Sequence, residues 1–258
     1  MIITSWNVNS VRARIENIKE YLLKFSPDVV MMQEIKTQDE TFPYDDFSAL
    51  DYESHVFGQK SYNGVAIISK HKLENVRLDL IKDKLKQSRI ISAELKHNKK
   101  NIQIINIYTP NGNPVDTEKY SYKKEWLDSL IKQLKALSKK NENIILAGDF
   151  NILPSAEDAY NIKGFEDDAL YRLEIRKKFR EMINLGFHDA YRHIHGEKEG
   201  YTYWDYMRGA WQKNNGLRID HFLISNSLLN IVKDVKINKD PRGKEKPSDH
   251  TPIEIELA

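Results

Sequence analysis

The stretch "NIILAGDFNI", residues 143–152, decides the fold class that we expect. Its apolar run from Ile144 to Ala147 has the length and the residue types of a β-strand. Asp149 and Asn151 follow where the run stops, and residues two apart in an extended segment share a face. The sequence therefore predicts a strand that brings a carboxylate and an amide to one point.

Apolar runs of the same kind recur along the chain. We predict strands at "MIITSW" (1–6), "DVVMMQ" (28–33), "GVAIIS" (64–69), "NIQIINIY" (101–108), "LRIDHFLI" (217–224) and "TPIEIEL" (251–257). Between them, apolar residues recur at helical spacing in residues 15–25, 126–137 and 175–183. Many short strands with three long helices favour an α/β fold in which two sheets pack face to face with helices outside.

Composition and charge are those of an ordinary globular chain without cysteine. The 258 residues are 40% hydrophobic, and no low-complexity linker divides them, so we predict a single domain over residues 1–258. The absence of Cys excludes disulfides and thiolate chemistry. The formal net charge of +2 is small, so an anionic partner must be bound by a local patch of positive charge. Without a signal-peptide core or a membrane-length apolar run, we expect a cytoplasmic monomer, nucleoid-associated when acting, with no membrane partner.

Polar side chains stand where several of the predicted strands end. They are Asn7, Glu34, Tyr108, Asp149, Asn151, Asp220, Asp249 and His250. Carboxylate and amide oxygens without thiolates are hard ligands, which favours Mg²⁺, with Mn²⁺ as a substitute, over zinc. Hydrolysis of a phosphodiester needs neutralisation of the charge on the phosphoryl oxygens, activation of a water molecule and stabilisation of the leaving group. A cation, a His–Asp pair and neutral donors such as Tyr and Asn supply these.

The segment "KPSDHTPI" near the C-terminus encloses Asp249 and His250 between two prolines. Pro247 disfavours helix before it and Pro252 can begin the strand that follows, so both polar residues lie in a stiff loop. Taken alone, this loop is typical of a solvated turn with a capping Asp. However, Asp220 lies among apolar neighbours, and a buried carboxylate needs a partner. We therefore predict that Asp220 accepts a hydrogen bond from His250 and raises its pKa above the ordinary value of about 6.5.

Eight motifs occur in the order expected of one known family. They are "SWNVNSVRAR", "PDVVMMQEIK", "YNGVAIISK", "INIYTPNG", "LAGDFNI", "YTYWDY", "GLRIDHFLIS" and "KPSDHTPI". With them the chain resembles, over nearly its whole length, the exonuclease III-type abasic-site endonucleases of the endonuclease/exonuclease/phosphatase superfamily. "YTYWDY" and "GLRID" point to the DNA-repair branch. The resemblance implies a DNase I-like, four-layered α/β sandwich whose two mixed β-sheets open onto one metal-containing cleft.

The resemblance also implies roles for individual residues. The expected metal ligands are Asn7, Glu34, Asp149, Asn151 and Asp249. The expected catalytic residues are Tyr108, Asp149, Asn151, Asp220 and His250. In that scheme Asp220 orients His250, which contacts the scissile phosphate either as a base or as a cationic clamp.

Aromatic and basic residues supply the expected DNA surface. The DNA-binding set comprises Asn63, Arg89, Asn111, Tyr203, Trp204, Arg208, Leu217 and His250, and further candidate phosphate contacts are Lys36, Lys60, Lys119 and Lys123. By resemblance, Tyr203, Leu217 and Ile219 line an abasic pocket with Trp204 close by. Taken alone, the aromatic residues are more typical of core or surface packing than of a binding site, and each lysine is equally typical of plain surface. Segment 154–171 follows the family pattern less clearly, and we expect it to form a DNA-facing loop that tunes abasic cleavage against 3′-end trimming.

The function that the resemblance implies is that of a Mg²⁺-dependent DNA-repair nuclease acting on double-stranded DNA. It would cut 5′ of abasic sites and remove nucleotides or blocking groups from 3′ ends. Two alternatives stay open. One is a phosphodiesterase of the same fold acting on a lipid or inositol phosphate, and the other is a catalytically silent DNA-binding module, which predicts the loss of at least one catalytic residue.

Overall fold

Two six-stranded β-sheets face each other in the computed structural model, which describes residues 1–140 and 143–258. The first sheet has the order β11-β12-β1-β2-β4-β3, and the second has the order β5-β6-β7-β8-β10-β9. The first sheet consists of β1 (Ile2–Asn7), β2 (Val29–Gln33), β3 (Glu53–Phe57), β4 (Val65–Ser69), β11 (Val232–Ile237) and β12 (Ile253–Leu257). The second consists of β5 (Leu73–Arg77), β6 (Ile90–His97), β7 (Lys100–Tyr108), β8 (Ile144–Asp149), β9 (Phe187–Asp189) and β10 (Asp220–Ser225).

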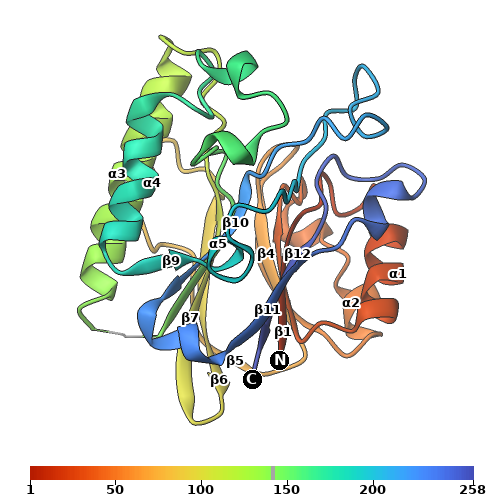
Figure 1. The fold of residues 1–258 in the computed structure, drawn as a ribbon. Coiled ribbons are helices and arrows are strands. Elements are labelled where there is room, and N and C mark those ends of the chain that lie inside the picture. Colours follow the sequence, from red (N-terminus) through yellow and green to blue (C-terminus); the bar gives the residue numbers. More distant parts are fainter. Residues whose placement is uncertain (141–142) are drawn as a thin grey trace.

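Helices cover the outer face of each sheet (Figure 1). The α-helices are α1 (Ile15–Phe25) and α2 (Tyr44–Ser48) on the first sheet, α3 (Glu118–Leu137) and α4 (Leu173–Asn184) on the second, and the short α5 (Ala190–His195). The 3-10 helices are η1 (Asp39–Thr41), η2 (Ala156–Asp158), η3 (Ile162–Phe165), η4 (Asn226–Ile231) and η5 (Asp240–Gly243). None of the helices in the described ranges is both long enough and apolar enough to cross a membrane.

Alternation of side chains along the strands divides the core into layers. In β2, Val29 and Met31 face the second sheet, whereas Val30 and Met32 pack under α1 and α2. Full burial of one such side chain contributes roughly 1.5–3 kcal/mol, so residues on both faces of the strand stabilise the stack. The arrangement confirms the four-layered α/β sandwich with two mixed sheets that the resemblance implies.

The strand register gathers polar residues at one edge of the sandwich. In the first sheet the parallel pair β1–β2 places Asn7 beside Gln33, the residue that precedes Glu34. In the second sheet Tyr108 pairs with Asp149 across β7–β8, and Asp220 pairs with Asp149 across β8–β10. The ends of strands from both sheets therefore converge where the sequence places its catalytic candidates.

Most of the architecture agrees with the sequence patterns. All seven predicted runs are strands, and the three periodic segments lie in α1, α3 and α4. The patterns do not predict the interior strand β6. They also miss the four edge strands β3, β5, β9 and β11, because edge strands expose one side and carry mixed residue types. Helix α3 begins earlier than its aliphatic stripe, since its first turns bury Tyr120, Tyr122 and Lys123.

A buried polar bridge joins the two sheets next to these strand ends. Gln33 Nε2 donates to Ser5 Oγ at 3.1 Å and to Asn106 Oδ1 at 2.7 Å. Asn106 Nδ2 in turn donates to the carbonyl oxygens of Met32 and Ala66, both at 2.9 Å. Because these polar groups are fully buried, each needs its partner, and the bridge fixes one sheet relative to the other.

Asn106→Ala should therefore destabilise the protein by roughly 2–4 kcal/mol, since it opens a cavity and leaves buried polar groups without partners. Denaturant unfolding monitored by circular dichroism measures this loss. Asn101→Ala, at an exposed position of the same strand, is the matched control and should stay within about 0.5 kcal/mol of wild type. Equal stability of the two variants would contradict a structural role for the bridge.

Candidate active site

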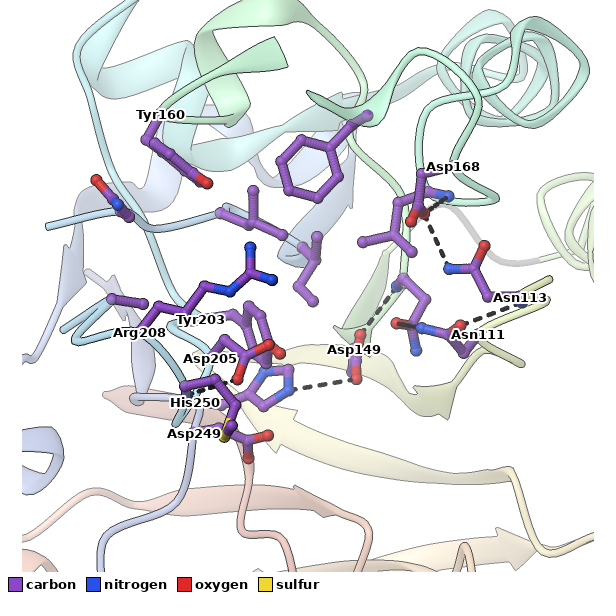
Figure 2. A pocket seen from close by; sticks show the side chains of 18 of the residues that line it. Asn111, Asn113, Asp149, Tyr160, Asp168, Tyr203, Asp205, Arg208, Asp249 and His250 are labelled. Atoms are coloured by element: carbon purple, nitrogen blue, oxygen red, sulfur yellow. Dashed lines mark hydrogen bonds and ion pairs between the residues drawn. The ribbon is translucent and has the colours of Figure 1, made fainter. Parts of the chain in front are cut away.

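Two carboxylates and an imidazole meet at the edge where the strand ends converge. Glu34 follows β2 with a φ of 49°, a left-handed conformation that turns the chain out of the sheet. Asp149 ends β8, and His250 lies in the loop before β12. One ligand atom from each of the three residues lies within 4.8 Å of the others. Figure 2 shows the imidazole of His250 facing Asp149.

Asp220 orients His250. Its Oδ2 lies 2.8 Å from His250 Nδ1, and both residues are buried, so the pairing predicted from the sequence is present. The pairing leaves Nε2 directed at Asp149 Oδ2, 3.8 Å away. Burial by itself would lower the pKa of His250, but the charges of Asp220, Asp149 and Asp249 outweigh it and raise the pKa far above its ordinary value. The imidazole is therefore a cation at neutral pH, with an N–H group on each side.

Hydrogen bonds as well as prolines hold the His250 loop. Ser248 Oγ donates to the carbonyl oxygen of Asn7 at 2.7 Å and accepts from the backbone N–H of His250 at 3.2 Å. The indole of Trp6 donates to the carbonyl oxygen of His250 at 3.3 Å. The loop is thus bonded to β1, and Ser248, which the sequence analysis left without a role, is part of the site.

Asn7 links the two carboxylates. Its Nδ2 donates to Glu34 Oε1 at 2.9 Å and to Asp149 Oδ2 at 3.0 Å, while its Oδ1 accepts from the backbone N–H of Asn9. As placed, Asn7 is a donor to the carboxylates and does not offer an oxygen ligand, unlike the expectation from the resemblance. Lys36 Nζ lies 2.9 Å from Glu34 Oε2.

The two carboxylates differ in their ionisation. Burial by itself would raise the pKa of Glu34, but Lys36 and Asn7 hold the pKa below its ordinary value, with help from His250. Burial raises the pKa of Asp149. The charge of His250 acts against this increase, and the neighbouring carboxylates of Asp220 and Glu34 add to it. Glu34 is therefore an anion at neutral pH, whereas Asp149 can exchange a proton there.

The donor set suits a hard divalent cation. Mg²⁺ in proteins usually takes one or two carboxylates, and the oxygens of Glu34 and Asp149 converge here. His250 contributes no lone pair while it is an imidazolium, so the carboxylates would hold the ion. The residues present therefore fit a metal of the Mg²⁺ type.

The two other expected ligands are engaged with protein groups. Asn151 Oδ1 accepts from Asn111 Nδ2 at 3.1 Å, and its Nδ2 donates to the carbonyl oxygen of Thr109 at 3.0 Å. Asp249 Oδ1 accepts from Asn9 Nδ2 at 3.0 Å. Asn9, which the sequence analysis did not single out, thus bonds to both sides of the site, because its Oδ1 also accepts from Lys36.

Tyr108 stands beside the carboxylates with Arg89 behind it. The Arg89 guanidinium lies 4.6 Å from the centre of the Tyr108 ring and donates to the Tyr108 carbonyl oxygen at 3.1 Å. Burial raises the pKa of Tyr108, and the charges of Glu34 and Asp149 raise it further, so the hydroxyl stays protonated and is available as a donor. Arg89 is buried and supports this ring, although the sequence analysis placed it among the direct DNA contacts.

A cavity of about 810 Å³ opens in front of these groups (Figure 2). One wall carries the polar residues Glu34, Tyr108, Asn111, Asp149, Asn151, Asp249 and His250. The other walls come from segment 154–171, with Tyr160, Phe165, Asp168 and Leu170, and from residues 203–219, with Tyr203, Asp205, Met207, Arg208, Leu217 and Ile219. Figure 2 shows the Arg208 side chain extending into the cavity. The structure therefore brings the predicted catalytic residues and most of the predicted pocket residues together.

A buried ion network holds one of these walls from behind. Arg218 lies between the wall residues Leu217 and Ile219, and its side chain points to the opposite face, where it bonds to Asp158 at 2.7 Å and to Asp189 at 2.8 Å. Arg218 is 1% exposed. Because breaking a buried ion pair leaves an uncompensated charge, this network fixes the position of the wall.

Two expected DNA contacts lie away from the cavity surface. Trp204 is fully buried, packs against Trp211 with ring centres 4.8 Å apart and donates to Asn214 Oδ1, so it has no surface to offer to DNA. Lys123 is also fully buried, within α3. The lysines at 60 and 119 are exposed, and the side chain of Asn63 is bonded to Gln59.

The comparison with known proteins agrees with this geometry. A model of the endonuclease/exonuclease/phosphatase family matches residues 4–250. The chain belongs to this family. The exodeoxyribonuclease III of Haemophilus influenzae is 34% identical, over 98% of this chain and 98% of its own.

Two solved structures share the whole fold. A 3′ phosphatase from Neisseria, bound to a product DNA hairpin, superimposes with a TM-score of 0.94 at 32% identity, over 100% of this chain and 99% of its own. An AP endonuclease from Archaeoglobus fulgidus gives a TM-score of 0.92 at 32% identity with the same coverage. In both sequence and structure, the chain is thus similar to enzymes that process DNA.

The charge state of His250 can be measured directly. In the metal-free protein we expect its ring resonances not to titrate between pH 6 and pH 8, because the raised pKa keeps the imidazolium through this range and releases the proton only at higher pH. In Asp220→Asn the titration should move down into the range, since the principal stabilising charge is gone. Histidine NMR titration tests both statements, and exposed His193 provides an internal control. A His250 pKa unchanged by Asp220→Asn would contradict the pairing as its cause.

Proposed function

We propose that the protein is a DNA-repair nuclease that hydrolyses phosphodiester bonds of double-stranded DNA in base excision repair. It cuts 5′ of abasic sites and acts on 3′ ends as a 3′–5′ exodeoxyribonuclease and end-cleaning phosphodiesterase. The observation that carries the proposal is the convergence of Glu34, Asp149 and the Asp220–His250 pair on one cavity. The exodeoxyribonuclease III, 3′ phosphatase and AP endonuclease to which the chain is similar support the substrate class.

The phosphate is held by donors of different charge. His250 donates its Nε2–H to a non-bridging phosphoryl oxygen as a cation, because Asp220 occupies Nδ1. Tyr108 and Asn111 offer neutral donors from the same wall. Asn151 keeps Asn111 in place through the bond between their amides. His250 is therefore a cationic clamp and not the base of the reaction.

Asp149 is the group that moves a proton. Its raised pKa lets it take a proton from the attacking water near neutral pH and return it to the leaving oxygen. The backbone N–H of Asn151 donates to Asp149 Oδ1 at 2.9 Å and fixes that carboxylate. Glu34 and Asp149 would hold a divalent cation, Mg²⁺ or its substitute Mn²⁺. When bound, this cation supplies charge that stabilises the phosphoryl oxygens.

The cavity walls select the DNA substrate. Tyr203, Leu217 and Ile219 present an aromatic and apolar surface that accepts a deoxyribose without a base. Arg208 reaches into the same space and supplies a positive charge for a backbone phosphate. The chain acts on the DNA as a monomer.

The two alternatives have less support. A catalytically silent module would lack at least one of the catalytic residues, and all of them converge on the cavity or support a residue that lines it. The lipid or inositol phosphate phosphodiesterase shares the polar wall, and an assay on those substrates distinguishes it from the nuclease.

One gel assay tests the proposal. Labelled duplexes carrying an abasic site, a recessed 3′ end or a 3′-phosphate are incubated with Mg²⁺, with Mn²⁺ or with a chelator. We expect cleavage of all three in either metal, none in the chelator, and a loss of roughly 10²–10⁴-fold in rate for His250→Ala. The exposed substitution His193→Ala should leave the rates unchanged. Full activity in the chelator, or inactivity on every DNA substrate, would contradict the proposed function.

A further inference from the structure

Lys123 is a fully buried lysine whose ammonium group is bonded only to main-chain oxygens among the described residues. It lies in α3, and its Nζ donates to the carbonyl oxygens of Asn111 at 3.0 Å, Asn151 at 2.6 Å and Ala169 at 3.0 Å. All three of its N–H donors are therefore satisfied, and none of them reaches the cavity surface.

The three carbonyls belong to three segments that line the cavity. Asn111 lies in the β7–α3 loop, Asn151 follows β8, and Ala169 ends the stretch of segment 154–171 that carries the wall residues Tyr160 and Phe165. These segments are far apart in sequence, and Lys123 lies where they meet.

Side-chain bonds join the same segments a second time. Asn113 Nδ2 donates to Asp168 Oδ1 at 3.0 Å, and Asn113 Oδ1 accepts from the backbone N–H of Ala169 at 3.0 Å. The Asn111–Asn151 amide bond links the other two segments. Among the residues that the structure describes, the ammonium of Lys123 is thus the one group that bonds to all three segments at once.

The buried space around Lys123 fits the shape of its side chain. A Cβ at Gly112, where φ is 86°, would lie 2.6 Å from Lys123 Cδ, so only glycine lets the loop cross the lysine stem. Burial lowers the pKa of Lys123 to about 7, with Asp149 and Asp168 opposing the decrease. Filling this space does not require an ammonium, because a methionine of similar length would avoid its desolvation. The N–H donors therefore have a task beyond packing.

We propose that Lys123 is a positioning residue that fixes the wall formed by segment 154–171 against Asn151, and thereby sets the relative rates of abasic-site cleavage and 3′-end trimming. The inference rests on the proposed nuclease function. Since the bonds run to backbone atoms of both segments, loss of the ammonium lets the wall formed by segment 154–171 and the end of β8 move apart. Small displacements of groups that position a substrate reduce the chemical step strongly.

The test compares Lys123→Met with wild type at a temperature where circular dichroism shows the variant folded. We expect kcat on the abasic duplex to fall at least tenfold, the ratio of abasic cleavage to 3′-end trimming to change, and the salt dependence of DNA binding to stay that of wild type. Lys132→Met, at an exposed position of the same helix, is the matched control and should behave as wild type.

Two outcomes of this comparison would overturn the inference. One is a wild-type kcat together with a wild-type ratio of activities. The other is a weaker salt dependence of binding in Lys123→Met, equivalent to about one phosphate contact, which would make Lys123 a direct DNA ligand. If Lys123→Met does not fold, Asn113→Ala breaks the parallel link to residues 168–169 and should lower kcat several-fold, and a wild-type kcat there would overturn the inference as well.

Hydrogen exchange of the free protein separates this inference from the proposed function. In Lys123→Met the backbone amides of Ala169 and Leu170 should exchange faster than in wild type, because the bonds that order their segment weaken. Unchanged exchange would contradict the positioning role even if the wild-type protein cuts DNA. Faster exchange in a protein whose wild type cuts no DNA would support the positioning contact while rejecting the nuclease assignment.

Discussion

The buried pairing of Asp220 with His250 is the interaction on which the rest of the site depends. Strand register places Asp220 directly beside Asp149, so two carboxylates share a buried edge. Such a pair is unfavourable unless a positive charge lies nearby. The imidazolium of His250 supplies that charge, because it bonds to Asp220 and faces Asp149. The same contact therefore permits the fold to bury the carboxylates and leaves a cation aimed into the cavity.

The fold supports this interaction from several directions. Parallel pairing in each sheet brings strand ends to one edge, and the polar bridge from Gln33 to Asn106 keeps the two sheets in register with each other. Ser248 bonds the His250 loop to β1. On the second sheet, Arg218 holds one cavity wall through buried carboxylates, and Lys123 holds another through backbone carbonyls. Charged groups buried behind the walls thus determine the shape of a site that combines a polar wall with an aromatic and apolar one.

Local sequence patterns predicted the parts of this structure that depend on local chemistry. Apolar runs identified the seven interior strands other than β6. The buried setting of Asp220 predicted that it needs a partner, with an imidazole as the natural candidate, and the resemblance identified that partner as His250. The patterns were wrong where the outcome depends on which side of a segment meets the core. Tyr203 lines the cavity whereas its neighbour Trp204 is buried, and no property of either ring distinguishes them in advance.

Lys123 illustrates the same limit. A lysine on a helix is normally solvated. Lys123 is buried because three segments that are distant in sequence meet around it, and each of them offers a backbone carbonyl oxygen to its ammonium group. Segment 154–171 lies at the cavity, as expected of a DNA-facing loop, but its place there is set by contacts with Asn113 and Lys123 that no periodicity encodes. The edge strands were missed for a different reason, because they expose one side and carry mixed residue types that leave no apolar run.

A double-mutant cycle on abasic-duplex cleavage tests the central claim most directly. Single-turnover rates are measured for wild type, His250→Ala, Asp220→Ala and the double variant, all under saturating enzyme. If Asp220 acts only by holding His250 in its cationic orientation, the double variant cleaves at the rate of His250→Ala alone, since nothing is left for Asp220 to position. Rate losses that multiply in the double variant would contradict the account, because Asp220 would then contribute to the reaction independently of His250.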